Sequence, residues 1–85
     1  MGQIYKLIER LQAKPKDFTF QETINLLNHF GYKEKTGGKT SDSRVTFVNK
    51  KHDYIRIHKP HPRNVLKPYQ VTNLLNDLED RGLLC

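Results

Sequence analysis

The chain is poor in several features, and each scarcity narrows what it can be. A single cysteine, Cys85, in 85 residues excludes an intramolecular disulfide and any metal site built from several thiolates. The sequence has no run of roughly 20 apolar residues, so we expect no membrane span. Its start, MGQIYKLIER, mixes acid and base in a helical pattern instead of forming the apolar stretch of a signal peptide. We therefore expect a cytoplasmic protein with no membrane partner.

Acidic residues are also few, because nine Asp and Glu stand against fifteen Lys and Arg, for a formal net charge of +6. The excess is uneven: residues 33–67 hold ten basic and three acidic side chains, and the other fifty residues hold five and six. This segregation indicates a basic face that suits a polyanionic partner. The plain alternative is a solvated surface of ordinary lysines and arginines.

Two helices are expected in the first third of the chain. The first, over residues 3–13, is indicated by four apolar residues at helical spacing: Ile4, Leu7, Ile8 and Leu11. Pro15 stops this helix. The second begins where Thr19 and Glu22 have the spacing of a capping box, and Gly31 is placed to terminate it.

Three strands follow the second helix. We expect them over residues 32–36, 44–49 and 53–58, with a short hairpin between the last two. Alternation in the last two strands puts four apolar side chains on one face: Val45, Phe47, Ile55 and Ile57. The opposite face then carries the polar and basic side chains of these strands, together with Val48.

A last helix runs from Pro68, in its first turn, to Gly82, which ends it. With residues 1–15 set aside as a helical appendage, the order of elements is α-β-β-β-α. This order predicts an α+β fold in one domain, residues 1–85, as a two-layer sandwich of three antiparallel strands with helices on one face. We expect the appendage to cover a sheet edge or to assist pairing with a partner.

The glycine-rich segment KTGGKTSDSR at residues 35–44 is not a P-loop. That motif needs a glycine separated by four residues from its Gly-Lys pair, with a strand before it and a helix after it. Nucleotide hydrolysis is therefore excluded. The loop instead offers Lys39 and Arg44 to a nucleic-acid phosphate, and an ordinary hairpin connection is about equally plausible on composition.

The segment HKPHPR at residues 58–63 contains two histidines. The i, i+3 spacing of His58 and His61 in a proline-rich stretch does not aim both rings at one metal ion, so we expect no metal. Metal-free RNA cleavage needs a base, an acid and a cation, which histidine with arginine or lysine supplies near neutral pH. The alternative to a catalytic role is that His58 merely ends an outward-facing strand and His61 is a solvated loop residue. We assign no role to His29 or His52.

Three stretches together resemble the HicA toxin family: FTFQETINLLNHFGY, the glycine-containing turn into SRVTF, and PHPRNVLKPYQVTNLL. The resemblance covers residues 17–84, and the order of elements agrees with it. HicA toxins are small basic ribonucleases of bacterial toxin–antitoxin pairs. They cleave mRNA without the ribosome, have a fold like the double-stranded-RNA-binding domain, and are silenced by a HicB antitoxin.

The resemblance implies a modified active site. The family's Gly-Ser-His falls on Asp42-Ser43-Arg44, so its histidine is absent, and an always-protonated guanidinium cannot be a general base. His61, or else His58, would then transfer the proton; otherwise activity is weak, or the protein binds RNA without cutting it. Ser43 and Arg44 would contact the phosphate.

The implied partners are mRNA and a HicB-like antitoxin, and no cofactor is implied. The expected RNA-binding residues are Lys35, Lys39, Ser43, Arg44, Arg56, Lys59, Arg63 and Lys67. Two other functions stay open: a non-catalytic RNA-binding module of the same fold, and a protein-interaction domain for an acidic partner.

Overall fold

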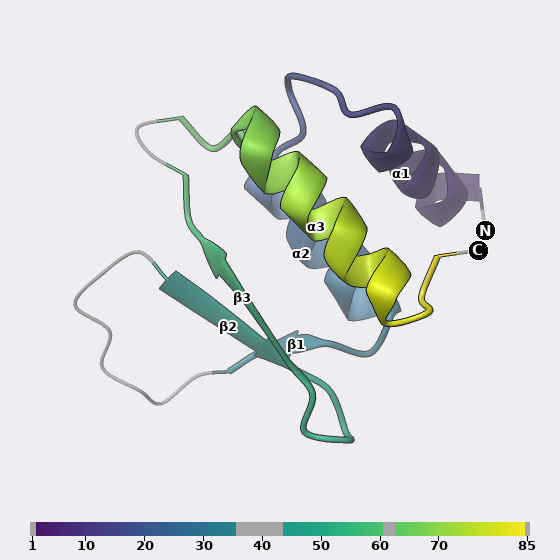
Figure 1. Ribbon diagram of the computed structural model, residues 1–85, viewed down its shortest axis with the longest axis vertical. Coiled ribbons are helices and arrows are strands. Elements are labelled where there is room, and N and C mark those ends of the chain that lie inside the picture. Colours follow the sequence, from purple (N-terminus) through teal and green to yellow (C-terminus); the bar gives the residue numbers. More distant parts are fainter. Residues whose placement is uncertain (1, 36–43, 61–62, 85) are drawn as a thin grey trace.

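The computed structural model describes residues 2–35, 44–60 and 63–84, with six helices and strands in that part of the chain. These elements are α1 (Gly2–Gln12), α2 (Phe20–His29), β1 (Lys33–Glu34), β2 (Arg44–Val48), β3 (Tyr54–His58) and α3 (Pro68–Asp80). Figure 1 shows α2 and α3 on one side of the sheet, with α1 beside them and away from the strands. The predicted α+β fold with antiparallel strands is confirmed.

The helices begin and end where local chemistry predicts. The Glu22 backbone N–H donates to Thr19 Oγ1 (3.0 Å), and the Thr19 N–H donates to the Glu22 carboxylate (2.9 Å), which completes the predicted capping box of α2. Gly31 follows α2 with φ +90°, and Gly82 follows α3 with φ +73°. Residues with a side chain rarely adopt this left-handed backbone conformation, so glycine is the suitable terminator at both places.

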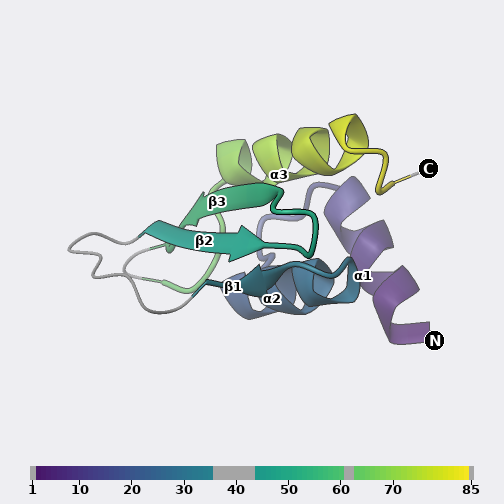
Figure 2. The same ribbon diagram turned by 90° about the horizontal axis from the view of Figure 1, so that it is seen from below.

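The sheet has the order β1-β2-β3, with both pairs antiparallel (Figure 2). In the hairpin, the Asn49 side chain accepts from the backbone N–H groups of Lys51 and Asp53 (both 2.9 Å). The register sets Phe47 opposite Ile55, and both are buried against the helices. The predicted inward face is therefore confirmed, although β1 is shorter than the expected strand over residues 32–36.

Helix α1 is part of the helical layer. It packs mainly against α2 and α3, and its Leu11 side chain is fully buried in the core that also contains Phe18. At its surface, Arg10 forms ion pairs with Glu22 (3.0 Å) and Asp17 (3.2 Å). The helix thus rests on other helices and not on a sheet edge. Among the described helices, none has the length and apolar character to cross a membrane.

An ionic network ties the hairpin to the end of α3. Arg81 pairs with Asp53 (2.9 Å) and Asp77 (3.1 Å), and it donates to the backbone carbonyl of Tyr54 (2.9 Å). The buried Tyr32 hydroxyl donates to the same Asp53 carboxylate. The hydrogen bond from Tyr32, and then Arg81, lower the pKa of Asp53, while burial and Asp53 raise the pKa of Tyr32.

The second half of the connection from β3 to α3 is anchored to the helical layer. The Leu66 N–H donates to the Phe18 carbonyl (2.8 Å), and the Phe20 N–H donates to the Asn64 carbonyl (2.9 Å). The buried Leu66 side chain joins the core. At the start of the connection, Gln70 Nε2 donates to the His58 carbonyl (2.9 Å), which fixes the end of β3 against α3.

Candidate nucleic-acid interface

The sheet face turned away from the helices is open to solvent and strongly basic. Across β2 and β3, Arg44 lies opposite His58, and Thr46 lies opposite Arg56. Directly opposed residues of an antiparallel pair project from the same face with Cβ atoms about 5 Å apart. The side chains of Arg44, Arg56 and His58 are exposed. The register alone therefore places Arg44 and His58 next to each other on one face, at one end of the sheet.

Strand β1 adds two more cations to this face. Lys33 lies opposite Val48, and the Lys35 N–H donates to the Thr46 carbonyl (2.7 Å), so both lysines share the face of Thr46. Lys35 Nζ lies 5.4 Å from the centre of the Tyr54 ring, which projects from the same face. This cation–π contact spans the sheet from β1 to β3.

We call this surface the basic sheet face, and it comprises Lys33, Lys35, Arg44, Arg56 and His58. Within the three described strands the only acid is Glu34, which alternates to the other face. Like charges on neighbouring strands repel and weaken a sheet. Folding needs a solvent-facing sheet surface to be polar, but it does not need charge of one sign, so the arrangement favours recognition of an anion.

The structure brings together some of the predicted RNA-binding residues and separates others. Lys35, Arg44 and Arg56 share the basic sheet face with His58, as the alternation predicts. A second group is exposed on the connection between β3 and α3 and not on a strand: Lys59, Arg63 and Lys67. The remaining predicted residues lie outside the described residues: Lys39, Ser43 and His61.

The neighbouring Arg44 and His58 have the chemistry for acid–base work on a phosphodiester. An imidazole accepts and donates protons near neutral pH, and a guanidinium neutralises charge that develops on phosphate oxygens. In the described parts of the chain, no three His, Cys, Asp or Glu residues gather to hold a metal ion. Arg44 and His58 could themselves supply charge stabilisation and proton transfer.

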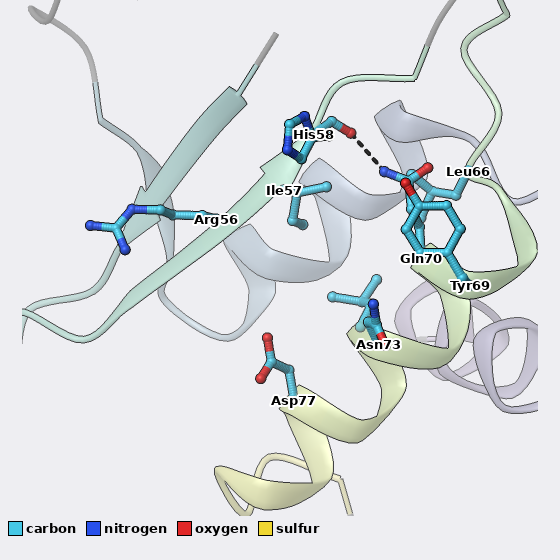
Figure 3. A pocket seen from close by; sticks show the side chains of 9 residues that line it. Arg56, Ile57, His58, Leu66, Tyr69, Gln70, Asn73 and Asp77 are labelled. Carbon is cyan, nitrogen blue, oxygen red and sulfur yellow. Dashed lines mark hydrogen bonds between the residues drawn. The ribbon is translucent and has the colours of Figure 1, made fainter. Parts of the chain in front are cut away.

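A cleft of about 120 Å³ adjoins the basic sheet face between β3 and α3 (Figure 3). Its apolar lining comes from Ile57, Leu66 and Leu74. Its polar and aromatic lining includes Arg56, His58, Tyr69, Asn73 and Asp77. Figure 3 shows the Arg56 side chain pointing away from α3, on the other side of β3 from Asn73 and Asp77. Arg56 thus borders the cleft at β3, while its guanidinium points to the other side of the strand.

Several residues of this region are not among those predicted from the sequence. Lys33 belongs to the basic sheet face, and the alternation in YKEK was the signal for it. The row formed by Tyr69, Asn73 and Asp77 has i, i+4, i+8 spacing, which marks one polar side of a helix. That spacing does not reveal the opposing strand, so the cleft itself could not be predicted.

Comparisons of the chain with protein-family models, curated proteins and solved structures find no match. The resemblance to HicA toxins therefore stays a hypothesis that rests on the residues named above.

Proposed function

We propose that the protein binds RNA on the basic sheet face and acts as a HicA-like mRNA endoribonuclease of a type II toxin–antitoxin pair. One observation carries this proposal: the register of β2 and β3 groups Arg44, Arg56 and His58 on an open face that also holds Lys35. Cations at this spacing suit the phosphates of a nucleic-acid backbone, and binding to them releases counterions.

The proposed cleavage uses no metal ion. One imidazole takes the proton of the 2′-hydroxyl, and the resulting oxyanion attacks phosphorus and displaces the 5′-oxygen, which receives a proton from a second acid. His58 and His61 are the two candidates for these roles. Arg44, next to His58 across the strands, would neutralise the charge that grows on the phosphate oxygens. The products are a 2′,3′-cyclic phosphate and a free 5′-hydroxyl.

A ribonuclease assay with matched histidine variants tests the proposal. Purified protein is incubated with a long RNA, with and without EDTA, as wild type and as the His58→Ala, His61→Ala and His29→Ala variants. We expect cleavage that resists EDTA and falls about 10²- to 10⁴-fold in at least one of the first two variants. His29, exposed on α2, is the control and should leave the rate unchanged. Loss of cleavage on chelation would contradict the mechanism.

Binding without cleavage is the second candidate, and the occupant of one position favours it. Arg44 stands where the resemblance expects the catalytic histidine. An arginine can bind a phosphate, but it stays protonated and cannot take the proton of the 2′-hydroxyl as a general base. RNA that stays intact while a salt-sensitive gel shift forms would identify a binding module. If no gel shift forms even at low salt, both RNA cleavage and RNA binding are contradicted.

We also propose an acidic HicB-like antitoxin as the protein partner, since a silencing protein would have to cover the same cations. The neighbouring reading frame should then encode a short acidic protein. Adding that protein should release bound RNA from the basic sheet face. An acidic neighbour that binds without displacing RNA would place its contact elsewhere on the molecule.

A further inference from the structure

The cleft between β3 and α3 is small. Its volume is about 120 Å³. Pockets for complete small-molecule ligands typically exceed ~300 Å³. The cleft therefore suits one planar group that projects from a larger ligand held elsewhere.

The lining of the cleft suits an aromatic group. Leu66 and Leu74 are nearly fully buried and give it an apolar floor. Tyr69 stands at its edge with 59% of its surface exposed, although α3 could carry any polar residue there. An exposed aromatic ring beside an apolar hollow is a surface on which a nucleic-acid base can stack.

The polar groups of the cleft differ in whether they already form hydrogen bonds within the protein. Gln70 donates to the His58 carbonyl and accepts from the Lys67 N–H (both 2.9 Å), so it serves the fold. Asp77 accepts from Arg81. Asn73 is exposed and makes no side-chain hydrogen bond within residues 2–35, 44–60 and 63–84. Its amide offers both a donor and an acceptor, which matches the mixed edge of a base.

The cleft and the basic sheet face meet at the edge strand β3. His58 lines the cleft and also belongs to the basic sheet face, while the Arg56 side chain lies on the far side of the strand from Asn73 (Figure 3). Since β3 is an outer strand of the sheet, no further strand within the described residues separates the two surfaces. A nucleotide chain that crosses this edge can place a phosphate on one side and a base on the other.

From this juxtaposition we infer that the cleft receives one unpaired base of single-stranded RNA, stacked against Tyr69, while the neighbouring phosphate rests on the basic sheet face beside His58. The inference rests on the proposed RNA binding and narrows its substrate class. A base inside a duplex is stacked and paired, so it can enter the cleft only after it has been unpaired. The protein should therefore prefer single strands.

Binding to a 12-nucleotide single strand and to the duplex of the same sequence tests this inference. The proteins are wild type, Tyr69→Ala, Tyr69→Phe and Tyr5→Ala; Tyr5, 68% exposed on α1, is the matched control. We expect Tyr69→Ala to weaken single-strand binding about 5- to 150-fold and to leave duplex binding unchanged. Tyr69→Phe keeps a ring for stacking and should retain the affinity, as should Tyr5→Ala.

A 2-aminopurine at successive positions of the single strand gives a second readout, because stacking quenches its fluorescence. Quenching at one position in wild type, lost in Tyr69→Ala, supports the inference. Single-strand affinity that is unchanged in Tyr69→Ala but reduced in Arg56→Ala overturns it and leaves the proposed function intact. Equal weakening on single strand and duplex also overturns it. If RNA binds to none of these proteins, both the proposed function and the inference are contradicted.

Discussion

Two solvent-exposed regions of the molecule carry opposite charge. The basic sheet face holds four cations and a histidine on three strands. Helix α3 contains no lysine or arginine, and its last four residues include three acids: Asp77, Glu79 and Asp80. The fold requires only polar side chains in both places. The separation of sign therefore gives the molecule a field that would turn its sheet, and not the end of α3, toward an anion.

Both regions carry their charge against the preference of local structure. Like charges on adjacent strands repel, and acids at the C-terminal end of a helix oppose the helix dipole. Arg81 offsets part of the second cost through its ion pairs with Asp53 and Asp77. Folding alone would favour mixed charges in each region, which is why we attribute the difference between them to recognition.

Reversing charge on the basic sheet face should have the largest effect. We expect the double variant Lys35→Glu/Arg56→Glu to bind RNA about 100-fold more weakly at low salt, because each reversal replaces an attraction of roughly 0.8 kcal/mol at 5 Å by a repulsion. Both side chains are exposed, so the fold should persist. Filter binding measures the affinity, and circular dichroism checks the fold.

The matched control reverses charge on α3. Glu79→Lys/Asp80→Lys changes the net charge by the same amount in the opposite direction, at two exposed positions. It should leave the affinity unchanged or slightly raised. If reversal on α3 strengthened binding as much as reversal on the sheet weakened it, net charge and not its location would govern binding.

Removing Arg81 should show that a paired cation acts on stability instead of recognition. Its guanidinium has three partners, and its side chain is 24% exposed. We expect Arg81→Ala to lower the free energy of unfolding by about 1–3 kcal/mol, because Asp53 and the Tyr54 carbonyl lose their donor. Urea unfolding measures this change. Arg63→Ala, at an exposed position of the connection, should stay within about 0.5 kcal/mol of wild type.

The same network gives a pH dependence. Because folding lowers the pKa of Asp53, the folded state binds its proton less readily than the unfolded state. The stabilisation is present above the unfolded value of about 3.9 and is lost as pH falls through the lower folded value. Asp53→Asn should therefore weaken the fall in the free energy of unfolding between about pH 5 and pH 2. Urea unfolding at a series of pH values measures this change. An unchanged acid limb would contradict the role of Asp53. Glu22, whose pKa is also lowered, accounts for a further part.

The helix limits and the sheet were predictable because their causes are local. Thr19 with Glu22, and Gly31, act within one turn of the chain, and the two-residue period of β2 and β3 fixes which side chains face the core. The neighbours of α1 were not predictable. An apolar stripe shows that a helix face is buried, but it does not show against which surface.

The candidate site was predictable to the same extent. Alternation plus a hairpin is enough to place Arg44, Arg56 and His58 on one face. Lys67 is close to them in sequence, but the connection after β3 carries it to the start of α3 (Figure 1). The cleft depends on how α3 packs beside β3, and that is a property of the tertiary structure alone.

The salt dependence of RNA binding tests the central claim most directly. If the four cations of the basic sheet face each neutralise a phosphate, the slope of log Kobs against log salt should be about −3 for a single strand, at roughly −0.7 per phosphate. Lys35→Ala/Arg56→Ala should reduce its magnitude by about 1.4, and Glu79→Gln/Asp80→Asn should leave it unchanged. A slope that is the same in wild type and Lys35→Ala/Arg56→Ala would contradict RNA binding by this face.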